Sequence, residues 1–359
     1  MSRLRVGVVG VGALGRHHAR ILSELPEVQL VAVADCQAER GQEVAARCHT
    51  RWVPDHRWLM DDVDAVSIAV PTVAHLPVAA EFLLRGIPVL VEKPLAHSLS
   101  AARELVELAR RNGTLLQVGH IERFNAAWQA ALPWLEDPKY VRTERLAPFS
   151  FRSTDIGVVL DLMIHDIDLV LAAVRSPLRM VEAFGAALMG PHEDMVQARL
   201  RFQNGCIADL NVSRVHPQPR RTLTAWSRQG CVAVDLHQRT VRRFAPTAAL
   251  LHGASPVHVA QQGHADIEAL KASVFGQWLE SEELEVVVQD ALTAELAAFV
   301  DCVRSGREPL VNGEAALAAM EVAARVLGQV ACHQWDGHPG GTVGPLVLDA
   351  PLNKLRQAG

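Results

Sequence analysis

Short apolar runs alternate with amphipathic stretches over the first third of the chain. The runs are rich in valine, isoleucine and leucine, and a glycine ends the first of them, as is typical of buried parallel strands. They lie at 4–9, 28–34, 64–70, 87–91 and 114–118, and the stretches expected to be helical lie at 13–24, 76–85 and 99–112. This alternation predicts an α/β fold that begins with a doubly wound parallel sheet, with helices on both of its faces.

The pattern changes after His120, because apolar and polar residues then alternate one by one. This period of two predicts a mainly antiparallel sheet with one solvated face. The alternation is found at 196–202, 207–212 and 222–227, with turn signals at Asn204-Gly205 and Gln229-Gly230, and helices are expected at 158–174, 290–305 and 314–330.

These two patterns divide the chain into domains. We expect a dinucleotide-binding domain over 1–120 and a second domain, for substrate binding and oligomerisation, over 121–335. A Gly- and Pro-rich segment over 336–359 is expected to be an irregular tail.

Composition narrows the class of protein. The 359 residues carry a formal net charge of −5 and no long basic run, so a nucleic-acid partner is not expected. The six cysteines form no C-x-x-C pair, which favours reduced thiols over a zinc site. We find neither a signal-peptide cleavage region nor an apolar stretch long enough to span a bilayer. The sequence therefore predicts a cytoplasmic protein without membrane association.

A glycine motif follows the first apolar run. It fits G-x-G-x-x-G and lies between an expected strand and an expected helix, as a dinucleotide-binding motif requires. The glycines permit a tight turn and close approach of a pyrophosphate, and the N–H groups of the helix N-terminus face the phosphates. The residues expected to contact the cofactor here are Gly10, Gly12, Ala13, Leu14 and Gly15.

Asp35 ends the second apolar run and decides the choice of cofactor. A carboxylate at this position accepts hydrogen bonds from the adenosine ribose and repels a 2′-phosphate. The residues directly after it supply no arginine, and Arg40 is the one nearby reservation. The sequence thus favours NAD over NADP, although Asp35 is also suited to capping a helix.

Glu92-Lys93-Pro94 follows another expected strand, at the edge where ligands bind in open α/β sheets. A lysine there can hydrogen-bond a substrate hydroxyl and stabilise a developing alkoxide. A lone lysine is more often a solvated surface residue. The functional interpretation of Lys93 therefore rests on the residues around it. Pro94 is a candidate for a cis peptide bond that fixes the lysine backbone.

Asp161 and His165 lie four residues apart on the expected helix over 158–174, so they share a face. A buried histidine beside a carboxylate is a candidate general base, and Asp168 is a rival for orienting it. Two alternatives are a purely structural pair and a zinc site. Because no third ligand cluster is visible, no metal is expected.

Two further groups follow expected strands of the first domain. Pro71, Thr72 and His75 come after the third strand and are expected near the cofactor, with a strand end and a helix cap as the equally weighted alternative. His120, Glu122, Arg123 and Asn125 lie at the domain junction, where a cleft for substrate normally forms. They either contact substrate or bridge the domains. His17 and His18 are expected to pack against the first helix.

Together these motifs resemble the Gfo/Idh/MocA oxidoreductase family over roughly residues 3–330. The resemblance implies a Rossmann domain followed by an α/β domain with an open, mainly antiparallel sheet that forms dimer or tetramer interfaces. It also implies reversible hydride transfer between a nicotinamide and a sugar or cyclitol carbinol. The residues that it makes catalytic are Lys93, Asp161 and His165, with Glu92 and Lys93 also near the cofactor.

The segments 119–125 and 151–168 also look like the UDP-N-acetylglucosamine 3-dehydrogenase branch of that family. Such enzymes oxidise the sugar 3-hydroxyl for later amination, which leads to lipid A with amide-linked acyl chains. Expected substrate contacts are then His120, Arg123, Asn125, Arg152, Asp161 and His165. The diphosphate would need cationic or amide donors, for which Arg123, Arg152 and Arg214 are weaker candidates.

One departure from the family pattern concerns the approach to Asp161. Many members have a Gly-rich segment there, whereas this chain has Gly157 followed by Val158-Val159-Leu160, which is expected to reshape the sugar pocket. Two alternatives therefore stay open: an NAD-dependent dehydrogenase of a free sugar or inositol, and a non-catalytic regulator that binds NAD.

Overall fold

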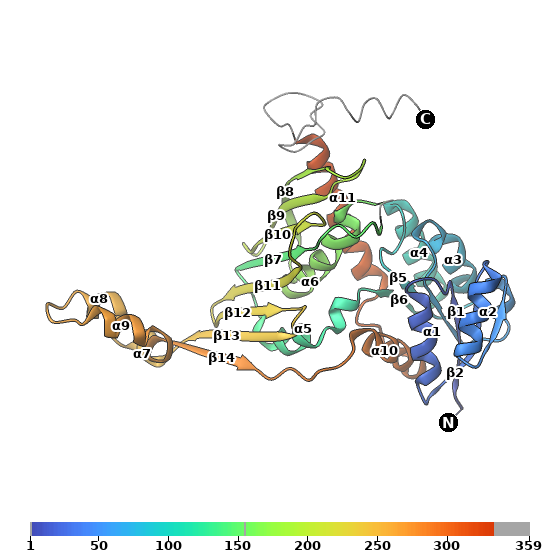
Figure 1. The fold of residues 1–359 in the computed structure, drawn as a ribbon, viewed down its shortest axis with the longest axis horizontal. Coiled ribbons are helices and arrows are strands. Elements are labelled where there is room, and N and C mark those ends of the chain that lie inside the picture. Colours follow the sequence, from blue (N-terminus) through green and yellow to red (C-terminus); the bar gives the residue numbers. More distant parts are fainter. Residues whose placement is uncertain (1, 154–155, 334–359) are drawn as a thin grey trace. The chain divides into compact units, whose positions relative to one another are not determined.

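The computed structural model describes residues 2–153 and 156–333, so the expected tail over 336–359 lies outside the described residues (Figure 1). The chain forms two compact units. Of the described residues, 2–129 and 287–321 make the first, and those within 130–286 and 322–333 make the second.

The first unit contains a six-stranded parallel sheet with the strand order β3-β2-β1-β4-β5-β6. This order confirms the expected doubly wound sheet. From β1 the chain adds strands first on one side, as β2 and β3, and then on the other, as β4 to β6. Ligands bind in such folds at the point between β1 and β4 where this order switches. The strands are β1 (Leu4–Val9), β2 (Val28–Ala34), β3 (Arg51–Val53), β4 (Ala65–Ile68), β5 (Val89–Glu92) and β6 (Leu116–Gly119).

Helices and short 3-10 turns connect these strands and cover the sheet. Between the strands lie α1 (Gly15–Glu24), α2 (Ala38–Arg47), η1 (His56–Leu59), η2 (Thr72–Ala74), α3 (His75–Leu84) and α4 (Leu99–Asn112). After β6 come η3 (Ile121–Phe124), α5 (Ala126–Ala131) and η4 (Leu132–Trp134), the last of which belongs to the second unit. The unit is completed by α10 (Ala291–Ser305), far along the chain. Its Leu296 and Phe299 are fully buried in the same core cluster as Val6 and Leu22, so α10 contributes to the hydrophobic core of the first unit.

The second unit contains an eight-stranded sheet with the order β14-β13-β12-β11-β7-β10-β9-β8. Neighbouring strands of this sheet are antiparallel except for the pair β7 and β10, so the expectation of a mainly antiparallel sheet is confirmed. Gly205 and Gly230 adopt positive φ angles of 85° and 121° in two of its turns. The strands are β7 (Tyr140–Leu146), β8 (Leu178–Ala186), β9 (Met195–Phe202), β10 (Ile207–Ser213), β11 (Arg220–Ser227), β12 (Gly230–Asp235), β13 (Thr240–Pro246) and β14 (Leu279–Leu284).

The helix expected over 158–174 packs on β7 and β10, but it is not one continuous α-helix. It begins as a π-helical turn, η5 (Val159–Met163), and continues as α6 (Ile164–Val174). The helix expected over 158–174 is thus present, but the pattern of apolar residues did not reveal that its first turn is π-helical. Polar contacts at its start, described below, hold the wider first turn.

The excursion between β13 and β14 was not expected from the sequence. It carries α7 (Ala248–His252), α8 (Pro256–Ala260), α9 (Ile267–Ser273) and the kinked turn η6 (Val274–Trp278), and it extends well beyond the two strands (Figure 1). No residue of α7, α8 or α9 is buried. Helices this short give no sustained periodicity, which is why the pattern of apolar residues did not reveal them.

The last described helix, α11 (Gly313–Cys332), is long and apolar enough to cross a membrane by length and composition alone. The expectation that no segment meets this criterion is therefore wrong. Core helices meet it as well, and the buried residues of α11 are mostly small, such as Ala316, Ala319 and Ala323.

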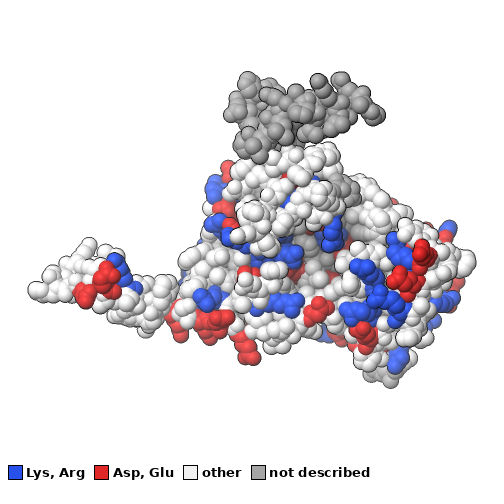
Figure 2. Space-filling model, in the orientation of Figure 1, with Lys and Arg blue, Asp and Glu red and all other residues white. Residues whose placement is uncertain are grey.

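Charges of both signs lie close together on the face of the molecule that Figure 2 shows.

Candidate active site

The glycine loop places the start of α1 against the end of β1. Gly10 has a φ of +79°, and a Cβ on Gly15 would lie 1.8 Å from the Gly10 carbonyl oxygen. Both positions therefore exclude a side chain, whereas a Cβ on Gly12 would meet nothing within 4 Å. The α1 N-terminus has no side-chain cap and no acidic residue in its first turn. Its N–H groups fit a pyrophosphate, as the motif predicted.

Asp35 lies at the end of β2, next to this loop. Its carboxylate accepts hydrogen bonds from the backbone N–H of Val11 and of Gln37, both at 2.9 Å. Arg40 pairs with it through Nη2 at 2.7 Å and Nε at 3.0 Å. Burial opposes ionisation of Asp35, but the hydrogen bonds from Arg40, Gln37 and Val11 outweigh it and lower its pKa. The Asp35 carboxylate is thus ionised at neutral pH, with Arg40 as its partner.

A pocket of about 160 Å³ opens beside Asp35. Its walls are mainly apolar, with a carboxylate and a guanidinium at one edge, which suits a base and its ribose. The lining includes Gly10, Asp35, Arg40, Val70, Pro71 and Val78. The structure therefore brings together three residues that the sequence predicted for the cofactor: Gly10, Asp35 and Pro71.

His75 lies between two loops at the carboxyl edge of the sheet. Its Nδ1 lies 3.0 Å from the carbonyl oxygen of Pro94, and its Nε2 lies 3.0 Å from that of Val70. Burial lowers the pKa of His75, against the opposing effect of these carbonyls. The neutral ring carries one N–H, so it can donate to only one of these two carbonyls at a time, either in the loop after β4 or in the loop after β5. A direct contact of His75 or Thr72 with the cofactor stays a prediction.

Lys93 follows directly on β5 and is half-buried, and its peptide bond to Pro94 is cis, as the sequence suggested. The Glu92 side chain is buried and accepts a hydrogen bond from the backbone N–H of Lys93 at 3.2 Å. His18 is buried against Glu92, as a packing role predicts, whereas His17 is exposed.

The residues expected at the domain junction lie at the end of β6. His120 and Asn125 are buried, and the Asn125 amide accepts from Ala127 N–H while donating to Glu122, both at 3.0 Å. Asn125 therefore caps α5. Arg123 donates to the carbonyl of Leu310 at 3.2 Å. Contacts of these residues with a substrate stay predictions.

In the second unit, Asp161 lies on η5 and is partly exposed, and His165 lies one turn later on α6 with 9% exposure. The neighbouring Asp166 forms a buried ion pair with Arg145 of β7, at 2.8 Å from Nη2 and 3.0 Å from Nε. Breaking such a pair leaves an unpaired buried charge, which is strongly destabilising. Arg145 thus anchors the segment that carries His165, although no motif in the sequence pointed to it.

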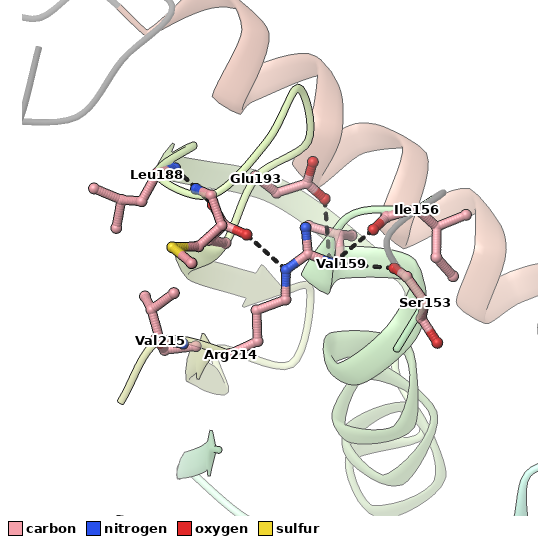
Figure 3. A network of polar contacts seen from close by, with 10 residues as sticks. Ser153, Ile156, Val159, Leu188, Glu193, Arg214 and Val215 are labelled. Carbon is pink, nitrogen blue, oxygen red and sulfur yellow. Dashed lines mark hydrogen bonds and ion pairs between the residues drawn. The ribbon is translucent and has the colours of Figure 1, made fainter. Parts of the chain in front are cut away.

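Arg214 organises the loop that leads to Asp161 (Figure 3). Its Nε donates to Asp194 at 2.6 Å, and its Nη1 donates to the carbonyls of Ser153 and Ile156 at 3.1 and 2.8 Å. Asp194 also accepts from two backbone N–H groups, those of Leu188 and Met189. Because Arg214 is buried and its Nε and Nη1 donors are engaged within the unit, it has a structural role here, and a contact with a diphosphate stays a prediction.

Glu193 holds the first turn of η5 (Figure 3). Its carbonyl accepts from Val158 N–H at 3.0 Å, and its carboxylate accepts from Val159 N–H at 3.2 Å. A Cβ on Gly157 would lie 2.0 Å from that carboxylate. Val158 and Val159 are fully buried, so this departure from the family pattern fills the core. No motif in the sequence pointed to Glu193.

Two candidate residues remain, Arg152 and Asp168. Arg152 is exposed, and Asp168 is buried on α6. Among residues 2–153 and 156–333, no group of three or more His, Cys, Asp or Glu side chains could hold a metal ion. The six cysteines are all described and free, and burial raises the pKa of Cys206 and Cys231 to about 11.

Comparison with known families gives two matches. Residues 4–120 match the model of an oxidoreductase family with an NAD-binding Rossmann fold, Gfo/Idh/MocA. Residues 117–233 match the model of a Gfo/Idh/MocA C-terminal domain.

Similar proteins match over nearly the whole chain. UDP-N-acetylglucosamine 3-dehydrogenase of Acidithiobacillus ferrooxidans is 33% identical over 327 residues, which cover 91% of this chain and 97% of that protein. A solved structure of that enzyme, GnnA, superposes with a TM-score of 0.81 over 92% of this chain and 98% of that one, also at 33% identity. The NAD(+)-dependent scyllo-inositol 2-dehydrogenase of Bacillus subtilis is 25% identical, over 89% and 92% of the two chains.

Replacement of Asp35 tests the cofactor choice. Asp35→Ser removes the charge that repels a 2′-phosphate and leaves Arg40 available to pair with one. A charge-assisted hydrogen bond is worth about 1.5–3 kcal/mol, so the ratio of kcat/KM for NAD to that for NADP should fall about tenfold or more. Adding Arg40→Leu should remove the gain in NADP use, and an unchanged ratio in Asp35→Ser would contradict this role.

Replacement of Gly157 tests the support of Asp161. In Gly157→Ala the new methyl group displaces the Glu193 carboxylate from Val159 N–H, which removes a cap worth about 1 kcal/mol of the free energy of unfolding. We expect kcat to fall about tenfold as the turn shifts. Glu193→Ala vacates the space, so the double variant should be no worse than Glu193→Ala alone. Additive losses in denaturation and rate measurements would disprove the coupling.

Proposed function

Because the chain belongs to the Gfo/Idh/MocA family of NAD-binding oxidoreductases, we propose that it oxidises the 3-hydroxyl of UDP-N-acetylglucosamine to a ketone, with NAD as the hydride acceptor. The observation that carries this proposal is its likeness, along nearly the full length of both chains, to an enzyme named for that reaction. The site supports it, since the open glycine loop and the pocket beside Asp35 suit NAD.

The chemistry is assigned to three side chains. His165 removes the proton of the 3-hydroxyl while the hydride leaves C3 of the sugar for C4 of the nicotinamide. Lys93 donates a hydrogen bond to the same oxygen and stabilises its developing negative charge. Asp161 orients His165 or binds a neighbouring hydroxyl. NAD supplies the electron-pair acceptor, and the chain supplies binding, orientation and proton transfer.

We also propose contacts and a place for the reaction. His120, Arg123, Asn125 and Arg152 are the proposed further sugar-nucleotide contacts. The 3-keto product suits amination, as needed for a lipid A with amide-linked acyl chains. Such a reaction belongs in the cytoplasm, where reduced thiols like those of this chain persist.

Copies of the chain are proposed to associate through the open face of the second sheet, as a dimer or tetramer. The face opposite η5 and α6 exposes Arg142, Thr224 and the half-exposed Trp226. A depression of about 490 Å³ crosses it, lined by residues that include Glu144, Arg220 and Thr224. Polar groups of both signs there suit a self-complementary contact.

The substrate is tested by adding NAD with UDP-N-acetylglucosamine, with myo-inositol or with simple hexoses, and recording NADH absorbance. We expect turnover with the nucleotide sugar. A 2-oxo acid is added in a parallel reaction, so that NADH held by the enzyme is reoxidised and product accumulates. Turnover with only the free cyclitol or sugar would overturn the proposal, and bound NAD without turnover of any carbinol would favour a regulator.

Two substitutions test the catalytic roles. His165→Asn and Lys93→Met should each lower kcat by about 10²–10⁴-fold, the range of general acid–base contributions. The exposed His237→Asn and Lys271→Met are matched controls and should keep wild-type rates. A folded His165 or Lys93 variant with near wild-type turnover would show that the assigned role is wrong.

The interface is tested with Thr224→Glu, which places a charge in the middle of the depression. Light scattering should give a lower molar mass than for the wild type, whereas Gln238→Glu on an exposed turn should leave it unchanged. An unaltered mass in Thr224→Glu would place the contact elsewhere.

A further inference from the structure

His18 is fully buried on α1, one turn after the glycine loop. Its Nδ1 lies 2.8 Å from the hydroxyl of Ser67 on β4. Its Nε2 lies 3.1 Å from Oε1 of Glu92, a close polar contact without the alignment of a hydrogen bond. A polar ring in such a position is costly unless it has partners, and Ser67 and Glu92 provide them.

Glu92 connects this ring to Lys93. One carboxylate oxygen faces His18, and the other accepts the backbone N–H of Lys93 at 3.2 Å. Gly119 of β6 also adjoins the carboxylate, since a Cβ there would lie 2.9 Å from Oε1. Helix α1, the start of the lysine loop and β6 therefore all lie against the carboxylate.

The series Ser67, His18, Glu92 contains the residue types of a nucleophilic triad, but its geometry excludes that function. Ser67 is fully buried inside β4, between two paired strands, so its hydroxyl has no route to a substrate. An activated nucleophile must reach the reacting atom. The buried hydroxyl instead orients the imidazole ring, as the third member of a triad does for its histidine.

We propose that His18 is a positioning residue for Lys93, acting through the Glu92 carboxylate. This inference rests on the proposed function, in which Lys93 contacts the carbinol oxygen. His18 fixes Glu92, Glu92 fixes the Lys93 backbone at the end of β5, and the lysine side chain is thereby directed. The same helix presents its N-terminus to the pyrophosphate, so one rigid element places both the cofactor and the lysine.

The inference is tested with His18→Leu and His18→Gln, with exposed His17→Leu as the matched control on the same helix. Leucine removes the polar contact, whereas the glutamine amide can still donate to Glu92. We expect His18→Leu to lower the single-turnover hydride-transfer rate about tenfold, because Glu92 and the Lys93 backbone lose a contact that fixes their position. The KM for NAD should change less than twofold, and His18→Gln should recover most of the rate.

A second measurement does not depend on activity. The chain has four lysines, at 93, 139, 271 and 354, so amine-selective labelling followed by peptide mass spectrometry reports on Lys93 directly. Relative to Lys271, labelling of Lys93 should change at least twofold in His18→Leu and in Glu92→Gln, and not in His17→Leu. If His18→Leu does not fold, Ser67→Ala and His18→Gln are compared in the same way.

The outcomes separate the two proposals. Unchanged Lys93 labelling together with an unchanged hydride-transfer rate in His18→Leu would overturn the positioning role. An equal loss of rate from His18→Leu in the wild type and in Lys93→Met would also overturn it, since His18 would then act by another route. Altered Lys93 labelling combined with full activity of Lys93→Met would instead support the positioning and disprove the proposed role of the lysine.

Discussion

The close approach of α1 to β1 is the constraint on which the site depends. A side chain at Gly15 would overlap the carbonyl of Gly10, so the helix can lie this close only with glycine at that position. Two consequences follow from this one contact. The α1 N-terminus faces the space where a pyrophosphate binds, and His18, three residues later, reaches the carboxylate of Glu92. Cofactor binding and the placement of Lys93 thus share one helix.

The second unit secures its catalytic candidates in a different way, through buried charges. Arg145 pairs with Asp166 beside His165, and Arg214 pairs with Asp194 below the loop that leads to Asp161. Pairs of this kind contribute little net stability compared with an apolar core, but removal of one partner is costly. Arg145 thus holds α6 to the sheet, Arg214 holds the loop before the π-helical turn, and Glu193 caps that turn.

Much of this could be predicted from the sequence, because the signals were local. The glycine loop, Asp35 and the lysine after β5 each adjoin a strand whose apolar run is plain, and the parallel order of the strands brings them to one edge. Arg145, Glu193 and Arg214 gave no such signal, since their partners lie between 20 and 61 residues away along the chain. The helices between β13 and β14 were missed because they bury no residue. The π-helical turn was missed because its first turn is set by contacts from a distant loop.

The central claim is that hydride leaves C3 of UDP-N-acetylglucosamine for NAD bound beside Asp35 and the glycine loop. The most direct test is to incubate the enzyme with UDP-N-acetylglucosamine that carries deuterium at C3, and to analyse the nicotinamide by mass spectrometry. The account predicts reduced cofactor with one deuterium and a nucleotide sugar that has become a ketone. Reduced cofactor without deuterium, or deuterium transfer from labelled myo-inositol but not from the nucleotide sugar, would contradict it.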